Sequence, residues 1–164
     1  EITYPDNTSI TYQYDLAGRM TKTINASHYS NYEYDALGRM TKEWMCNNVV
    51  ITKSYDNNGN QLTQLTKLGT RTLSSYTYVY NAINSVAKQT EILNGATTVK
   101  EYSYNENDEL IKTVKTQGST KTTTETVITL TGNKTEVTEG QVTYRAAYDD
   151  FNRIKTYYDG TYLL

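Results

Sequence analysis

Hydrophobic and polar residues alternate along most of the chain with a period of two. Ile10, Tyr12 and Tyr14 occupy every second position of one segment, and Met20, Lys22 and Ile24 do so after the next turn. Alternate side chains of a β-strand point to the same face, so this pattern predicts strands. The pattern predicts an all-β fold: an antiparallel meander of repeated β-hairpins, with about 14 to 16 strands in a strongly twisted or coiled sheet.

The alternation is organised as a repeat of roughly 20 to 25 residues. A tyrosine precedes each main turn, at Tyr14, Tyr34, Tyr55, Tyr80, Tyr104 and Tyr148. The last interval is about twice the others, which predicts a degenerate unit near residues 120–140 with a two-residue turn at Gly132-Asn133. We therefore predict one array over residues 1–164, of about seven units, truncated at both ends from a longer protein.

Each main turn pairs an acid or amide with a residue that tolerates a left-handed backbone. The left-handed position holds only Gly, Asn or Asp: Gly18, Gly38, Gly59, Asn84, Asp108 and Asn152. A short hairpin loop built on a type I turn needs positive φ there. The residue three positions earlier can bond its side chain to N–H groups of the turn, as in an Asx turn: Asp15, Asp35, Asp56, Asn81, Asn105 and Asp149.

Composition narrows the possible partners. The 164 residues include 17 tyrosines, one Phe and one Trp, with 16 basic and 18 acidic side chains. This balance offers no basic stripe for nucleic acid, and no apolar run approaches the length of a membrane span. We expect neither nucleic-acid binding nor membrane insertion. The single cysteine, Cys46, excludes an internal disulfide.

The motif "YxYDxxGRM" at 12–20 and 32–40, with "YDNNGNQL" at 55–62 and "YDDFNRI" at 148–154, resembles the tyrosine-aspartate (YD) repeats of Rhs-family proteins. That family includes bacterial wall-associated and polymorphic-toxin proteins, shell components of insecticidal toxin complexes and, more distantly, the teneurins. The residues that carry the resemblance are Tyr12, Tyr14, Asp15, Gly18, Arg19, Tyr32, Tyr34, Asp35, Gly38, Arg39, Tyr55, Asp56, Gly59, Tyr148, Asp149, Asn152 and Arg153.

The resemblance implies a ribbon of hairpins that builds a shell or an extended surface scaffold in a larger secreted or cell-surface bacterial protein. Its partners would be the neighbouring repeats of the parent chain. An alternative is an adhesion module that binds carbohydrate or a protein through exposed aromatic rings, with Tyr29, Trp44 and Tyr157 as candidates. Unpaired strands at the ends of the array also allow an edge-strand homodimer.

Catalysis has little support in the sequence. If Tyr34 pairs near Arg39, His28 falls opposite Met45 and next to Cys46, but accidental neighbours are favoured over a nucleophile pair, because an orienting group and an oxyanion hole are also needed. Successive turn acids lie two strands, roughly 10 Å, apart, so they favour structural caps over a shared metal site. We expect no enzyme activity, no cofactor and no metal.

Overall fold

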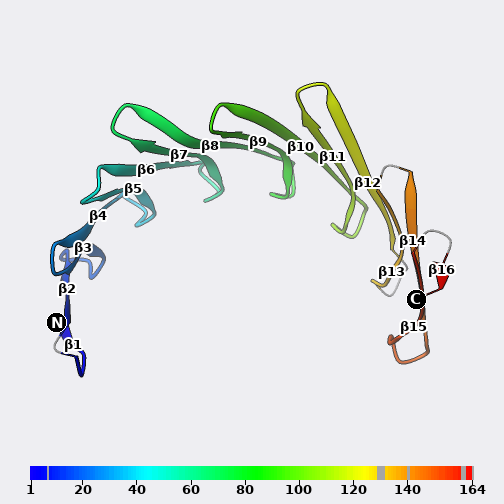
Figure 1. The fold of residues 1–164 in the computed structure, drawn as a ribbon, viewed down its shortest axis with the longest axis horizontal. Coiled ribbons are helices and arrows are strands. Elements are labelled where there is room, and N and C mark those ends of the chain that lie inside the picture. Colours follow the sequence, from blue (N-terminus) through cyan, green and yellow to red (C-terminus); the bar gives the residue numbers. More distant parts are fainter. Residues whose placement is uncertain (7, 129–131, 140, 160–161, 164) are drawn as a thin grey trace. The chain divides into compact units, whose positions relative to one another are not determined.

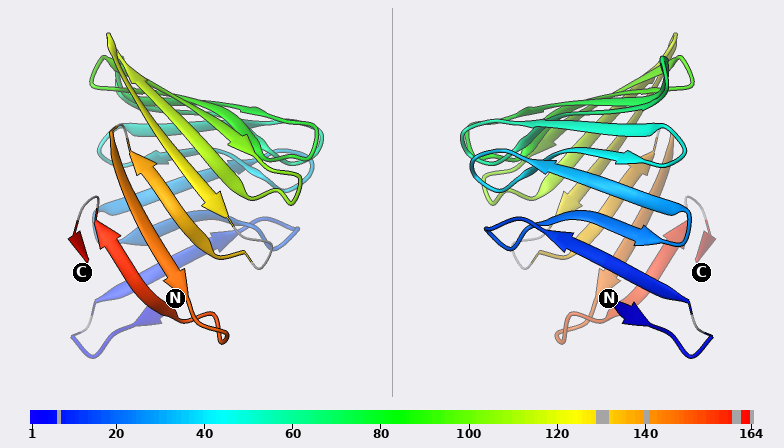
Figure 2. Two further views of the ribbon diagram at one scale, coloured as in Figure 1. Left: turned by 90° about the vertical axis from the view of Figure 1, so that its right-hand side faces the viewer. Right: turned by 90° about the vertical axis from the view of Figure 1, so that its left-hand side faces the viewer.

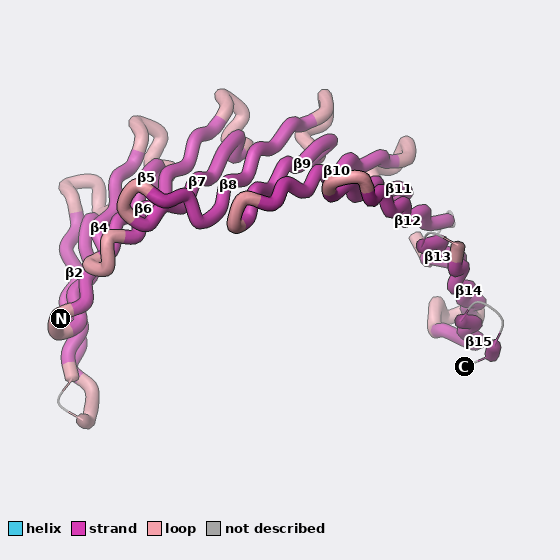
Figure 3. The backbone as a smooth tube through the Cα atoms, turned by 45° about the horizontal axis from the view of Figure 1, so that its top comes forward, coloured by secondary structure: helices cyan, strands magenta, loops and turns pink. Residues whose placement is uncertain are grey.

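The computed structural model describes residues 1–6, 8–128, 132–139, 141–159 and 162–163. Within these residues every regular element is a strand, and the hydrogen-bonded order of the 16-stranded sheet follows the chain order (Figures 1 and 3). The strands are β1 (Ile2–Thr3), β2 (Ser9–Tyr14), β3 (Met20–Asn25), β4 (His28–Tyr34), β5 (Met40–Met45), β6 (Val49–Tyr55), β7 (Gln61–Leu68), β8 (Arg71–Tyr80), β9 (Val86–Leu93), β10 (Ala96–Tyr104), β11 (Leu110–Gln117), β12 (Thr120–Ile128), β13 (Lys134–Glu139), β14 (Val142–Tyr148), β15 (Ile154–Asp159) and β16 (Tyr162–Leu163).

Two compact units make up the chain. The first comprises Glu1–Thr77 with Glu91–Gly95, and the second comprises Tyr78–Thr90 with Ala96–Leu164. Inside each unit, antiparallel strands follow one another through turns that alternate between two edges (Figure 2). The predicted all-β meander of hairpins is confirmed.

The main turns share one backbone geometry. The N–H of Asp15 donates to the carbonyl of Arg19 at 2.9 Å, and the N–H of Gly18 donates to the carbonyl of Asp15 at 3.0 Å. The same two bonds recur in the turns that begin at Asp35, Asp56, Asn81, Asn105 and Asp149. The left-handed residue has φ between 60° and 93° in all six turns. The turns whose sequences match the repeat motif weakly therefore have the same backbone geometry as the turns that match it closely.

A one-residue register shift accompanies these turns, and the alternation of the sequence did not reveal it. Tyr34 pairs with Met40, but its neighbour Glu33 pairs with Lys42. Equivalent shifts lie at Gln13/Tyr14, Ser54/Tyr55, Ser103/Tyr104 and Ala147/Tyr148. A β-bulge of this kind places two residues opposite one and increases the local twist. A strand register that is counted outward from the turn without allowing for the bulge is therefore wrong by one residue.

The predicted two-residue turn at Gly132-Asn133 is wrong. Ile128 pairs with Lys134, so five residues separate the strands, as in the other main turns, and Gly132 has a φ of 83°. Ile128 thus holds the position that a tyrosine holds in the other repeats. Residues 129–131 lie outside the described part of the chain. The physical reason is the bulge at Val127/Ile128, which requires the longer loop.

Neither compact unit has a hydrophobic core among the described residues. No described apolar side chain is fully buried, and Thr98, at 9% exposure, is the single described polar residue in the buried class. Several large apolar side chains at the turn tips are open to solvent, including Leu16, Leu37 and Phe151. No helix in the described part of the chain is long and apolar enough to cross a membrane. Stability must come from contacts within the plane of the sheet.

The positive φ at Gly38 gives a direct test of the turn geometry. Replacing Gly38 by Val should lower the free energy of unfolding by about 1 to 3 kcal/mol, because a β-branched residue is strained at positive φ. A Cβ at this site would meet its nearest neighbour, Arg19 Cδ, at 3.8 Å, so strain rather than a clash causes the loss. Leu37→Val, at the exposed neighbouring position, is the control. Equal urea midpoints for the two variants would contradict the turn assignment.

Candidate functional site: the repeat turns and a groove on the sheet

The carboxylate of each full turn closes the loop from inside. Oδ1 of Asp15 accepts hydrogen bonds from the N–H groups of Ala17 and Arg19, both at 2.9 Å, and Oδ2 accepts one from Arg19 Nε at 2.7 Å. Asp35 makes the same three bonds with Leu37 and Arg39, at 3.0, 2.9 and 2.7 Å. One side chain thus fixes the backbone of the turn and the direction of its arginine.

The remaining turns keep the backbone caps and change the side chain that completes them. Asn60 replaces the arginine in the third turn and donates from Nδ2 to Asp56 Oδ2 at 2.9 Å. In the turn that begins at Asn105 the donor and the acceptor exchange places: Asn105 Nδ2 donates to Glu109 Oε2 at 2.7 Å. The loop therefore requires a side-chain acceptor at its first position, whereas the residue at its last position can be Arg, Asn or Glu.

Hydrogen bonding lowers the pKa of the turn aspartates below the ordinary value. For Asp15, Asp35 and Asp149 the largest cause is the backbone N–H of the arginine at the end of the turn, and for Asp56 it is the side chain of Asn60. Donors that point at the ionised carboxylate favour its charged form. These carboxylates therefore serve as fixed anions, not as proton donors near neutral pH.

Each arginine that follows a turn glycine also reaches the next repeat. Arg19 Nη1 donates to the carbonyl of Asp35 at 3.1 Å, and its guanidinium carbon lies 5.1 Å from the centre of the Tyr34 ring. Arg39 repeats this contact with Asp56 at 2.7 Å and with the Tyr55 ring at 4.8 Å. The planar guanidinium provides both a directed hydrogen bond and a cation–π contact.

Several of the tyrosines that precede a turn make the return contact. Tyr34 Oη donates to the carbonyl of Met20 at 2.7 Å, and Tyr55 Oη donates to that of Met40 at 2.8 Å. Tyr104 and Tyr148 make equivalent bonds to Val86 and Lys134. Burial is the main cause of the raised pKa of Tyr55. We call the forward arginine contact and the return tyrosine bond the repeat link.

Side-chain exposure follows the repeat link. The side chains of Arg19 and Arg39, which contact a following turn, are 35% and 25% exposed. Arg153 makes the same bond to its own aspartate but is 74% exposed, and its guanidinium lies over the Phe151 ring of its own turn. Tyr14 is 60% exposed, whereas Tyr34 and Tyr55 are partly covered. Contact between repeats, and not the turn itself, covers these groups.

The aromatic side chains proposed for adhesion are found in three different settings. Lys22 Nζ lies 5.1 Å from the centre of the Tyr29 ring, and Lys42 Nζ lies 4.9 Å from that of Trp44. The ring of Tyr157 stacks on Tyr144, with centroids 6.4 Å apart and planes at 18°. Tyr29 and Tyr157 are 41% and 38% exposed, and Trp44 is partly covered. The adhesion role of these rings stays a prediction.

The predicted pairing of His28 with Met45 is wrong. Ser30 pairs with Met45, His28 pairs with Asn25, and the N–H of Cys46 donates to the carbonyl of Tyr29. The bulge at Glu33/Tyr34 and the tighter turn assumed from sequence account for this displacement of two residues. No hydrogen bond joins the His28 imidazole to the Cys46 thiol in the described structure. A Cys–His nucleophile is therefore not assembled among the described residues.

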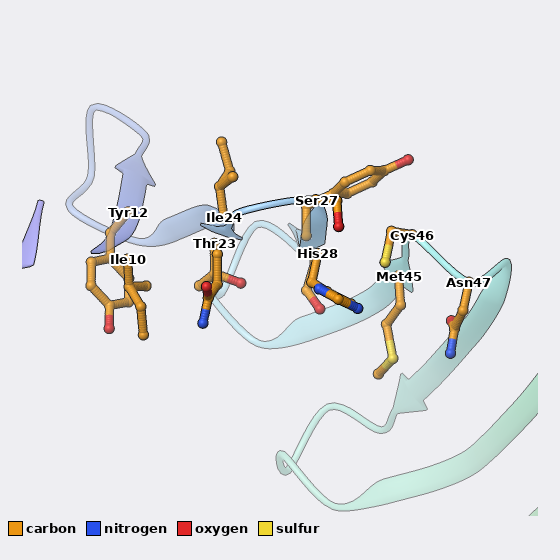
Figure 4. A pocket seen from close by; sticks show the side chains of 12 residues that line it. Ile10, Tyr12, Thr23, Ile24, Ser27, His28, Met45, Cys46 and Asn47 are labelled. Atoms are coloured by element: carbon orange, nitrogen blue, oxygen red, sulfur yellow. The ribbon is translucent and has the colours of Figure 1, made fainter. Parts of the chain in front are cut away.

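A groove of about 730 Å³ is lined by residues of β2, β3, β4 and β5 and of the turns beside them (Figure 4). Two side-by-side rows line it. The first row runs Tyr12, Thr23, Ser30, Met45 across four paired strands, and the second runs Ile10, Asn25, His28 across three. Figure 4 shows Tyr12, Ile10 and Met45 projecting from the same side of the sheet, and Ile24 from the other. The groove is thus part of the first unit alone.

Sequence reasoning missed the repeat link and the groove. The arginines belonged to the recognised motif, but no role was assigned to them, since a contact between turns 20 residues apart leaves no mark in a local pattern. Small side chains between Tyr12 and Met45 were a usable signal for the groove, once the register was known. In the described residues, no group of three or more His, Cys, Asp or Glu side chains is placed to hold a metal ion.

Comparison with known proteins connects this geometry to a family. The family model described as RHS Repeat matches residues 1–30. No match was found among curated proteins. Among solved structures, the one described as TcdB2-TccC3-TEV has a TM-score of 0.74 and 15% identity over 94% of this chain, and that of TcdB2-TccC3 has a TM-score of 0.73 and 14% identity over 88%.

A third structure, TcdB2-TccC3 without its hypervariable C-terminal region, has a TM-score of 0.58 and 14% identity, and covers 92% of this chain. The present chain spans 9% or 10% of the length of those three proteins. The repeat match and the shared fold support a structural repeat scaffold. They also confirm the resemblance to Rhs-type (YD) repeats that was inferred from the sequence.

Proposed function

We propose that this chain is a non-enzymatic scaffold segment that builds part of a shell or an extended surface in a larger secreted or cell-surface protein. The observation that carries the proposal is the repeat link, because it connects successive turns by contacts that need no ligand. Arg19 and Arg39 bind forward to the next turn, and Tyr34 and Tyr55 bind back. The partners of each repeat are then the repeats on either side.

The layout of the molecule supports this role. A repeat that contacts only its neighbours extends a structure without a closed core, and stability grows as repeats are added. The described residues have no buried apolar core, so each hairpin depends on the strands beside it. In this role residues 1–164 act as one array that comprises both compact units. The fold shared with TcdB2-TccC3, where it occupies about a tenth of a much longer protein, supports the same role.

Deleting one whole repeat tests the proposal. Removing residues 19–38 joins Gly18 to Arg39, so that a complete turn and both flanking strands are restored in the same register. We expect this variant to remain folded and to melt cooperatively, as a scaffold built from equivalent units should. Removing residues 19–29 instead changes the alternation and should abolish folding. Circular dichroism and thermal melts compare the two; loss of folding in both would contradict a modular array.

Replacing one arginine measures the strength of the repeat link. Arg39→Lys should lower the free energy of unfolding by more than about 1 kcal/mol, because an ammonium group cannot keep the bond to Asp35, the bond to the Asp56 carbonyl and the contact with Tyr55 together. Arg153→Lys is the matched control, since among the described residues Arg153 bonds only within its own turn. Urea unfolding should separate the two variants. A loss as large for Arg153→Lys would assign the effect to the turn alone.

The turn aspartates give the stability a defined pH dependence. Their pKa is lowered on folding, so their contribution is fully present above the unfolded value of about 3.9 and is lost as pH falls through the lower folded value. Asp35→Asn keeps the backbone caps, as Asn81 and Asn105 do, but removes the ion pair with Arg39. At neutral pH this variant should melt below the wild type, and the gap should narrow below about pH 4. A gap that is constant with pH would contradict the assignment.

A further inference from the structure

We infer that Tyr144 and Tyr157 form a site of oxidative modification, at which the two phenol rings are joined by a carbon–carbon bond into a dityrosine bridge between β14 and β15. The co-reactant is a one-electron oxidant of the peroxidase class, with hydrogen peroxide as the final acceptor of the electrons. The inference does not depend on the scaffold role, because it rests on a ring contact in the second unit and not on the repeat link.

The register of β14 and β15 places the two rings on one face of this hairpin. Tyr157 pairs with Ala146, and Tyr144 stands two residues before Ala146 on the same strand, so the two tyrosines are diagonal neighbours (Figure 2). Their ring centroids lie 6.4 Å apart, and their planes differ by 18°. Nearly parallel rings at this separation are offset, with their edges adjacent. The carbons that must join are therefore close without any change of the backbone.

Both phenol groups are open to reaction. Tyr157 is 38% exposed, and Tyr144 is partly exposed. Among the described residues neither hydroxyl makes a hydrogen bond within the protein, whereas the hydroxyls of Tyr34 and Tyr55 donate to backbone carbonyls. An oxidant can therefore take an electron from each ring while the hydroxyl proton passes to water.

The reaction balances on the two side chains and the named oxidant. Each ring loses one electron and its hydroxyl proton, and becomes a phenoxyl radical with spin density at the carbon ortho to the oxygen. The two ortho carbons form the new bond, and the hydrogen on each of them moves as a proton to the oxygen of its ring, which restores both aromatic systems. One hydrogen peroxide takes up the two electrons and two protons and is reduced to two molecules of water.

The composition of the second unit directs oxidation to tyrosine. Cysteine and methionine are the side chains that oxidants commonly attack, and the indole of tryptophan also gives up an electron readily. In this chain those residues all lie in the first unit: Met20, Met40, Trp44, Met45 and Cys46. A tyrosyl radical in the second unit therefore has no cysteine, methionine or tryptophan of the same unit to reduce it, and it survives until it meets a second tyrosyl radical.

A bridge at this position closes a hairpin that lacks the forward arginine contact. Among the described residues, Arg153 in the turn between β14 and β15 bonds only to its own aspartate. A covalent cross-link stabilises mainly by restricting the unfolded chain, here the loop of residues 145–156. Dityrosine thus adds covalently, to this hairpin, stability of the kind that the repeat link adds to the first two turns.

The neighbouring tyrosine on β15 provides the control. Tyr158 is 42% exposed, slightly more than Tyr157, but it pairs with Arg145 and so lies on the opposite face of the hairpin from Tyr144. Exposure alone predicts that Tyr158 reacts at least as readily as Tyr157. Ring contact predicts that Tyr157 alone is joined to Tyr144.

Oxidation of the purified, dilute chain with a haem peroxidase and hydrogen peroxide tests the inference. We expect a monomeric product that shows the blue fluorescence of dityrosine and has lost the mass of two hydrogen atoms. Trypsin should release peptides 135–145 and 156–164 from it as one cross-linked species, identified by mass spectrometry. Tyr157→Phe should lower the yield of this species at least tenfold, and Tyr158→Phe should change it less than twofold.

A second variant keeps the test decisive if Tyr157→Phe does not fold. Tyr144→Phe should also lower the yield at least tenfold, and thermal melts establish that each variant is folded. A bridge mapped to other tyrosines, or one formed only between two chains, would overturn the assignment of the site. Oxidation that yields no dityrosine would overturn the reaction. None of these failures would affect the repeat-deletion result, which tests the scaffold separately.

Discussion

The carboxylate inside each turn is the constraint on which the rest of the structure depends. By accepting two backbone N–H bonds and the arginine Nε, Asp35 fixes the loop, the bulge beside it and the direction of Arg39 at once. The guanidinium can then bond to the next turn only because its own aspartate holds it in place. A local cap thereby becomes a contact between repeats, and a sheet with no interior gains order along its length.

Contacts within the plane of the sheet replace the usual core. Cation–π contacts place Lys22 over Tyr29 and Lys42 over Trp44, and cross-strand ion pairs join Lys112 to Glu125 and Arg145 to Glu136. Exposed ion pairs of this kind stabilise by small amounts each. Their sum is spread over many strands, and it adds to a continuous backbone ladder. Tyrosine suits this design because one side chain supplies an apolar face and a hydrogen-bond donor.

Local features of the fold were accessible from the sequence, and distant ones were not. The period of two predicted the strands, and the Gly, Asn or Asp at the left-handed position located the main turns, since both depend on the conformation of single residues. The bulge did not appear in the alternation, so His28 was placed opposite Met45 and Gly132-Asn133 was given too short a turn. The repeat link and the groove were missed for a related reason: each joins side chains from different repeats, and their register had to be known first.

The loss of arginine at Asn60 has a consequence for how the chain folds. Among the described main turns, those at Asp15 and Asp35 have an arginine that bonds to the following turn, whereas Asn60 in the third turn bonds back to Asp56. In the segment from the first to the third turn, arginine side chains therefore connect hairpins that are close in sequence. Such contacts cost little loop-closure entropy, so we expect this segment to be the kinetic nucleus on which later hairpins assemble.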